Sequence, residues 1–126
     1  MIRALLLAAL LGAGAQSAAS QGAQISNTQE TVPVDTVRLK ALDTLIGMTT
    51  DIVVRVGETA RFGRLEILAE TCRVPAEDPK GDAYAFLRIR DTREADPRFS
   101  GWMFASSPAL SALDHPRYDV WVESCD

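Results

Sequence analysis

The sequence has few of the side chains that most often perform chemistry in proteins. Its 126 residues include one histidine and two cysteines. A structural zinc site normally takes four Cys or His ligands, so these three residues cannot supply one. The glycine-rich motifs that bind nucleotides and the nucleophile elbow of many hydrolases are also missing. The sequence therefore predicts no metal and no cofactor.

Positive charge is scarce as well. The chain has 13 Lys and Arg against 17 Asp and Glu, a net charge of −4. Proteins that bind nucleic acids neutralise phosphates with an excess of basic residues. The acidic balance therefore argues against a nucleic-acid partner.

Long hydrophobic runs are missing except at the start of the chain. After Arg3, residues 4–15 are uncharged and mostly apolar, and small residues follow up to Ser20. This is the composition of a cleaved signal peptide, and the run is shorter than the roughly 20 residues of a membrane-spanning helix. We predict a signal peptide at residues 1–20, cleaved after Ala15, Ala19 or Ser20, and no membrane span after cleavage.

The two cysteines, Cys72 and Cys125, both follow the predicted signal. An even pair in a small exported domain is most simply read as one disulfide. Such a crosslink would close a long loop and stabilise the fold by about 4 kcal/mol in the chain-entropy model.

The rest of the chain divides into a leader and one domain. Residues 21–35 are polar, contain Pro33 and show no apolar period, so they predict a flexible leader. Residues 36–126 are the length of a single ordinary domain.

Alternation of apolar and polar residues dominates this domain. It predicts six strands, near residues 37–46, 52–56, 65–71, 83–90, 99–104 and 118–122. We expect the second and third strands to pair antiparallel, and Thr71 to face the same side as Leu65. Ser107 and Pro108 are good starting residues for a short helix at 107–113. The predicted class is all-β, a small antiparallel barrel or sandwich with one short helix and one disulfide.

Aromatic residues share strand faces with charged ones. In the strand at 83–90 the apolar face carries Ala83, Ala85, Leu87 and Ile89. The opposite face carries Tyr84, Phe86, Arg88 and Arg90. Trp102 and Trp121 come from two further strands, and Trp121 shares its face with acidic neighbours. Because exposed aromatic and arginine side chains are enriched at binding sites, these six residues are the candidate binding surface. The alternative is that the leader or the short helix covers these aromatic rings.

A catalytic site is the second alternative. His115 lies near Asp114 and Ser107 in sequence, which allows an envelope hydrolase or an inhibitor-like protein. Each residue also has a local explanation, because Ser107 is a predicted helix cap and His115 precedes a proline. The acids of the loop at 75–82 predict a solvated loop rather than a calcium site, since the twelve-residue EF-hand spacing is missing.

Several stretches of the chain resemble one known family. They are residues 56–58, 61–67 and 118–122, the two cysteines, and above all the segment FSGWMFASSPALSALDHP at 99–116. These residues are similar to domain of unknown function 2155, small exported proteins found mainly in alphaproteobacteria. The resemblance implies a periplasmic location and no activity. In that compartment the candidate surface suits peptidoglycan, whose sugars stack on tryptophan and whose carboxylates pair with arginine, or an envelope protein.

Overall fold

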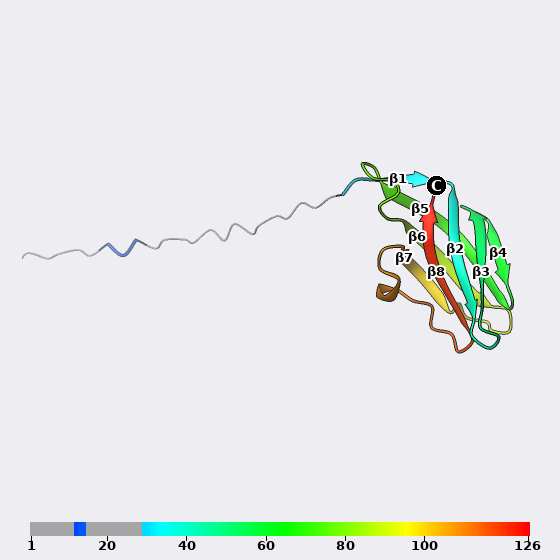
Figure 1. Cartoon of the computed structure of the whole chain (residues 1–126). Coiled ribbons are helices and arrows are strands. Elements are labelled where there is room, and N and C mark those ends of the chain that lie inside the picture. The colour runs from blue at the N-terminus through cyan, green and yellow to red at the C-terminus, as the bar shows by residue number, and fades with distance from the viewer. Residues whose placement is uncertain (1–11, 15–28) are drawn as a thin grey trace, which may run out of the picture.

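A computed structural model of the chain describes residues 12–14 and 29–126 (Figure 1). Most of the predicted signal peptide and of the predicted leader lies outside these residues. The described part is built of strands and a single 3-10 turn. In chain order they are β1 (Thr31–Val34), β2 (Thr36–Asp43), β3 (Met48–Arg55), β4 (Thr59–Phe62), β5 (Leu65–Pro75), β6 (Tyr84–Asp91), β7 (Phe99–Phe104), the turn η1 (Pro108–Leu110) and β8 (Tyr118–Cys125). No helix in the described part is long and apolar enough to cross a membrane.

The strands form two antiparallel sheets that pack against each other. The five-stranded sheet has the order β1-β5-β6-β7, with β4 also paired to β5, and the three-stranded sheet has the order β3-β2-β8. Each sheet keeps free edge strands, so within the described residues the domain is not a closed barrel. The all-β, antiparallel prediction is confirmed, and its barrel alternative is wrong.

The core between the sheets follows the alternation seen in the sequence. Ala85, Leu87 and Ile89 of β6 are fully buried, as predicted, and they meet Val120 and Val122 of β8 within one hydrophobic cluster. A strand that buries every second residue presents the others outward. The same alternation that builds the core therefore sets the composition of the two outer faces.

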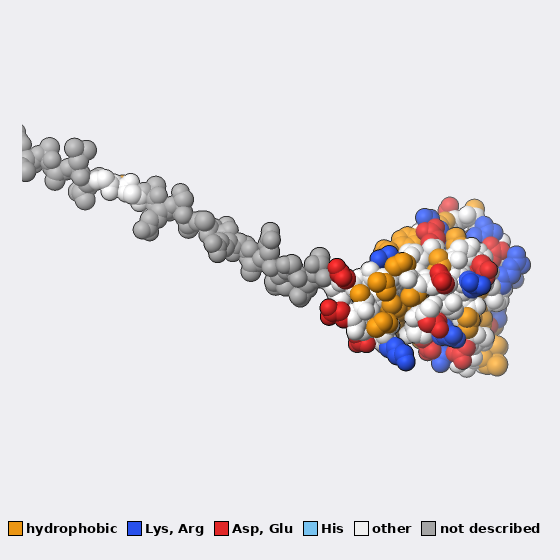
Figure 2. Space-filling view, turned by 90° about the horizontal axis from the view of Figure 1, so that it is seen from above, with side chains coloured by type: hydrophobic (Ala, Val, Ile, Leu, Met, Phe, Trp, Pro, Cys, Tyr) orange, Lys and Arg blue, Asp and Glu red, His pale blue; other side chains and the backbone are white. Residues whose placement is uncertain are grey.

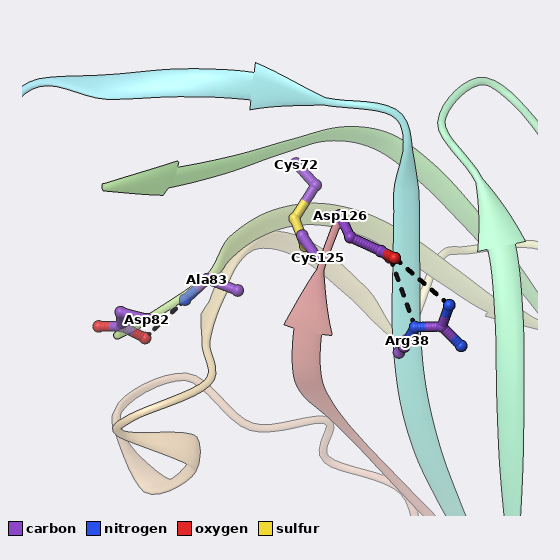
Figure 3. Close-up of a disulfide and its surroundings, with 6 residues drawn as sticks. All are labelled: Arg38, Cys72, Asp82, Ala83, Cys125 and Asp126. Carbon is purple, nitrogen blue, oxygen red and sulfur yellow. Dashed lines mark hydrogen bonds and ion pairs between the residues drawn. A yellow bond between two sulfur atoms is a disulfide. The ribbon is translucent and has the colours of Figure 1, made fainter. Parts of the chain in front are cut away.

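The disulfide between Cys72 and Cys125 is present and joins β5 of one sheet to β8 of the other (Figure 3). If side chains alternated strictly along β5 and β8, both cysteines would point outward, away from the core. In β5 the register shifts between Ala69 and Thr71, so that Thr71 turns outward, contrary to expectation, and Cys72 turns inward. A second shift in the pairing of β8 with β2 does the same for Cys125. Two β-bulges, each inserting one residue, thus aim both sulfurs at the core.

The expected pairing of the strands near 52–56 and 65–71 is wrong. β3 pairs with β2, whereas β5 pairs with β4, β6 and β1. The reason is the short strand β4, which turns at Gly63 directly into β5. Gly63 has φ +54°, and a side chain there would meet the Tyr118 hydroxyl at 2.5 Å. Only glycine fits this tight turn without strain.

The predicted helix at 107–113 is reduced to the 3-10 turn η1, and the side chain of Ser107 caps no backbone group. No residue of η1 is buried, and Leu113 beyond it is the one buried anchor of the segment. Because Leu110 stays 76% exposed, this stretch gains too little from packing to offset the cost of helix nucleation.

Strand β1 lies within the segment predicted as a leader. It pairs with the end of β5, and its Pro33 stands opposite Arg73. Proline is tolerated in a strand at a sheet edge because it need not donate to a neighbour. Residues 31–34 therefore form a paired edge strand rather than a flexible linker.

Candidate functional site

An aromatic cluster lies on the outer face of the five-stranded sheet. Tyr84 and Phe86 come from β6, and Trp102 and Phe104 come from the neighbouring β7. The antiparallel register places Phe86 opposite Trp102 and Tyr84 opposite Phe104. The rings of each pair meet edge to face, with centroids 5.5 Å and 5.7 Å apart. This is the geometry that aromatic quadrupoles prefer. The four residues Tyr84, Phe86, Trp102 and Phe104 are called the aromatic cluster below.

The cluster is open to solvent in part. Trp102 has 38% of its surface exposed, and the other three rings are half-buried. Gln29, which precedes β1, accepts a hydrogen bond from the Tyr84 hydroxyl at 3.3 Å. That contact is at one end of the cluster and leaves Trp102 accessible.

Arginines extend this face beyond the aromatic rings. Arg88 lies over the ring of Phe86, with 5.7 Å from its guanidinium carbon to the ring centroid, and forms an ion pair with Glu70. Arg90 pairs with Glu66 at 3.0 Å, and Arg61 of β4 reaches the same carboxylate at 3.2 Å. The outward positions of the sheet carry four arginines, counting Arg73, against the two glutamates. This face is therefore positive on an acidic chain.

A recess lies beside these arginines. It has a volume of about 360 Å³, and Leu68 and Pro97 supply apolar walls next to Arg88 and Arg90. A recess with apolar walls and guanidinium groups suits a ligand that has both apolar and anionic parts.

Trp121 does not join the cluster. It projects from the outer face of the other sheet, where it stands opposite Lys40. Lys40 lies 3.4 Å from Glu123 and 3.6 Å from Asp51. A hydrogen bond to Glu123 and the negative charge of both carboxylates raise the pKa of Lys40. The structure therefore brings together five of the six predicted residues and separates Trp121 from them.

A second recess lies next to the disulfide, at the end of the domain that carries the C-terminus (Figure 3). It measures about 520 Å³ and mixes Arg38 and Lys80 with Asp82 and Asp126. Figure 2 looks onto this end and shows acidic, basic and hydrophobic side chains interspersed. The mixture favours no single class of ligand.

Asp82 has a local structural task in this recess. Its carboxylate accepts hydrogen bonds from the Ser106 hydroxyl at 2.6 Å, from the Ser106 backbone N–H at 2.9 Å and from the Ala83 N–H at 2.8 Å. Partial burial raises the pKa of Asp82, but these hydrogen bonds together outweigh it and hold the pKa below the usual value. Within residues 12–14 and 29–126, no group of three His, Cys, Asp or Glu side chains could hold a metal ion.

His115 is paired with a residue that the sequence did not single out. Its Nδ1 accepts the backbone N–H groups of Arg117 and Tyr118 at 3.0 Å and 3.2 Å. The ring therefore carries its proton on Nε2 and donates it to Asp91 at 2.9 Å. Both side chains are buried, with 1% and 3% of their surface exposed.

This pairing bears on the predicted catalytic group. Among the described residues, the side chains of Ser107 and Asp114 make no hydrogen bond to His115, and its two ring nitrogens are already used. A general base must reach the proton that it abstracts, so the observed geometry assigns His115 to holding β6 against the segment before β8.

Sequence reasoning missed Phe104, Glu66 and Glu70 in the candidate site. Trp102 and Phe104 flank the buried Met103 in β7, so the alternation along the strand places both on the outer face and could have identified Phe104. The two glutamates carry no comparable signal, because their contacts depend on which strands pair across the sheet.

Comparison with known proteins agrees with the resemblance read from the residues. A family described as an uncharacterized protein conserved in bacteria (DUF2155) matches residues 37–125. The chain is also 29% identical over 91 residues to an uncharacterized protein of Rickettsia prowazekii (strain Madrid E). That match covers 70% of this chain and 59% of the relative, so the chain spans less than two thirds of that protein. No solved structure matches the chain.

Proposed function

Since the chain belongs to the DUF2155 family of uncharacterized bacterial proteins, we propose its function from its own surface: it is a non-enzymatic binding domain of the cell envelope. Its ligand contacts the outer face of the five-stranded sheet. The observation that carries this proposal is the aromatic cluster, with Trp102 exposed and Arg88 lying over the ring of Phe86.

The ligand proposed for this face is peptidoglycan. Sugar rings present apolar C–H faces that stack on an indole such as that of Trp102. Stem peptides present carboxylates, which guanidinium groups bind through parallel hydrogen bonds. A face with an excess of arginine on a chain of net charge −4 favours an anionic ligand on this side.

The arginines are arranged to receive such carboxylates. Arg88 and Arg90 each contact a glutamate through Nε. Within the described residues, the terminal nitrogens of both guanidinium groups make no hydrogen bond. Each glutamate thus orients an arginine and leaves its remaining N–H donors available for a ligand.

The location in the periplasm is part of the same proposal. It is supported by the signal-like composition of residues 1–20 and by the disulfide, since such bonds persist in oxidising compartments.

Sedimentation with purified sacculi tests the proposal. We expect wild type to sediment with sacculi and Trp102→Ala to lose at least tenfold in affinity, because exposed tryptophans are frequent binding hot spots. Trp121→Ala is the matched control, a half-buried tryptophan on the opposite outer face, and should bind as wild type does. Equal binding by both variants, or no sedimentation of wild type, would refute the peptidoglycan ligand. Capture of one envelope protein through Trp102 instead would keep the face and change the partner.

A further inference from the structure

The hairpin between β2 and β3 ends in an exposed hydrophobic tip. Leu45 has 73% of its surface exposed, and Ile46 and Met48 have 61% each. Single exposed apolar residues are ordinary, but turns usually carry Gly, Pro, Asn, Asp or Ser. Three large aliphatic side chains within four positions of one turn form a projecting patch. Leu45, Ile46 and Met48 are called the apolar tip below.

The turn beneath the apolar tip is held by hydrogen bonds. The backbone N–H and the hydroxyl of Thr44 donate to the carbonyl oxygen of Arg117 at 2.9 Å and 2.6 Å. The N–H of Leu45 donates to the side chain of Asp43 at 3.1 Å. The N–H of Gly47 donates to the carbonyl oxygen of Asp43 at 2.8 Å. Gly47 takes φ +69°, which closes the turn without strain.

The charges next to the turn are also paired. Arg117 donates from Nε and Nη2 to the two carboxylate oxygens of Asp43 at 3.0 Å and 2.8 Å. A bidentate pair of this kind is strong and directional. The charges of Asp43 and Arg117 therefore cancel within this pair.

These contacts satisfy hydrogen-bond donors at the turn before the side chains of the tip leave water. A polar group that enters an apolar medium without a hydrogen bond costs several kcal/mol, and this governs which backbone can enter a bilayer. Here the hydroxyl of Thr44 and the backbone N–H groups of Thr44, Leu45 and Gly47 already have partners inside the protein. Their desolvation therefore costs little, while the aliphatic side chains gain from it.

The shape of the tip favours a lipid surface over a protein interface. The hairpin lies at the end of the domain away from the C-terminus (Figure 1). Three side chains offer much less than the roughly 800 Å² per partner of a standard protein interface. A bilayer surface needs no matching shape, because amphipathic segments bury apolar side chains about 5–10 Å into the boundary of headgroups and acyl chains.

We propose that the apolar tip inserts into the interfacial region of a lipid bilayer and holds the domain reversibly at a membrane surface. The insertion is weak, because even one fatty acyl chain gives only marginal membrane binding. It does not depend on anionic lipid, because Asp43 and Arg117 neutralise each other at the base of the tip.

Flotation with phosphatidylcholine vesicles tests this. We expect the fraction of wild-type protein that floats to rise with lipid concentration, and the variant Leu45→Ser/Ile46→Ser/Met48→Ser to bind at least tenfold less. Val53→Ser is the matched control, because Val53 is 57% exposed on β3 of the same sheet but outside the tip, and it should float as wild type does. Trp102→Ala should also float as wild type does, which separates this proposal from the binding face.

Three flotation results would each overturn the proposal. One is wild type that does not float with neutral vesicles at high lipid. Another is equal flotation of the tip variant and wild type. A third is flotation only with vesicles that contain phosphatidylglycerol. Sedimentation velocity adds a further check, since a dimer that the tip variant abolishes would assign the tip to a second copy of the chain.

Discussion

The outer faces of the two sheets each carry one tryptophan, but the side chains around it differ. Both carry tryptophan on a strand whose outward positions also hold polar or charged residues. On the five-stranded sheet the cross-strand neighbour of Trp102 is Phe86, and the rings pack against each other. On the three-stranded sheet the neighbour of Trp121 is Lys40, which is held by two carboxylates. The residue opposite a tryptophan on the neighbouring strand therefore decides whether an aromatic cluster forms.

The charge of the two faces differs as well. Outward positions of the five-stranded sheet carry twice as many arginines as glutamates. Outward positions of the three-stranded sheet are balanced. Their charged residues are Arg38, Lys40, Arg55, Asp51, Asp119 and Glu123. The outer face of the five-stranded sheet is therefore the more positive of the two, and the proposed anionic ligand should prefer it.

The largest effect should come from releasing the two sheets from each other. Replacing Cys72 and Cys125 by serine removes the crosslink between β5 and β8, which spans a sequence separation of 53. The chain-entropy model gives a loss of about 4 kcal/mol in the free energy of unfolding. Urea unfolding of the variant and wild type measures it, and reduction of wild type should reproduce the loss. Unchanged stability would mean that the core alone holds the faces in place.

A smaller loss of stability should follow from removing the hydrogen bond between His115 and Asp91. His115→Ala removes the buried hydrogen bond to Asp91 and leaves two backbone N–H groups without their acceptor. We expect the free energy of unfolding to fall by about 2 kcal/mol, because buried donors are left unsatisfied. Ser107→Ala is the control and should unfold as wild type does, since its side chain caps nothing. A loss as large for Ser107→Ala would mean that the segment before β8 is held in another way.

The hydrogen bond between His115 and Asp91 also predicts how stability depends on pH. Hydrogen bonds from the Arg93 backbone N–H and from His115 lower the pKa of Asp91 to about 2, below its ordinary value of 3.8. A carboxyl whose folded pKa is depressed stabilises the fold above the unfolded pKa and loses that contribution as pH falls toward the folded pKa. Wild type should therefore lose stability between about pH 4 and pH 2. In Asp91→Asn the fall of Tm over this window should be shallower, and identical slopes would contradict the assignment.

The smallest effect should come from single arginines, and it compares the faces directly. Arg88→Gln should weaken binding to sacculi several-fold, because it removes guanidinium donors beside the aromatic cluster. Arg38→Gln removes an exposed arginine from the other face and should leave binding unchanged. Equal weakening in both variants would show that net charge, and not the cluster, attracts the ligand.

Much of this fold could be predicted because apolar and polar residues alternate along its strands. The inward and outward residues of β6 were predicted one by one, since a strand that forms one side of a core repeats every two residues. The disulfide could be predicted from two cysteines and a predicted export signal. The bulges that turn Cys72 and Cys125 inward could not, because each depends on the register with a partner strand.

The candidate site could be predicted only in part for the same reason. Tyr84, Phe86, Arg88 and Arg90 lie on one strand, so their common face follows from sequence. Which other strands complete that face depends on pairing between distant segments, and this pairing sends Trp121 to the other sheet. His115 was misleading because its true partner, Asp91, is 24 residues away and lies at the end of another strand.

The most direct test of the central claim uses the two tryptophans themselves. The chain has only two, so its NMR spectrum should show two indole N–H signals, which Trp102→Phe and Trp121→Phe assign. Titration with a soluble disaccharide-peptide fragment of peptidoglycan should shift the Trp102 signal and leave the Trp121 signal in place. A shift of Trp121 alone, or of neither signal at saturating fragment, would contradict a binding site on the outer face of the five-stranded sheet.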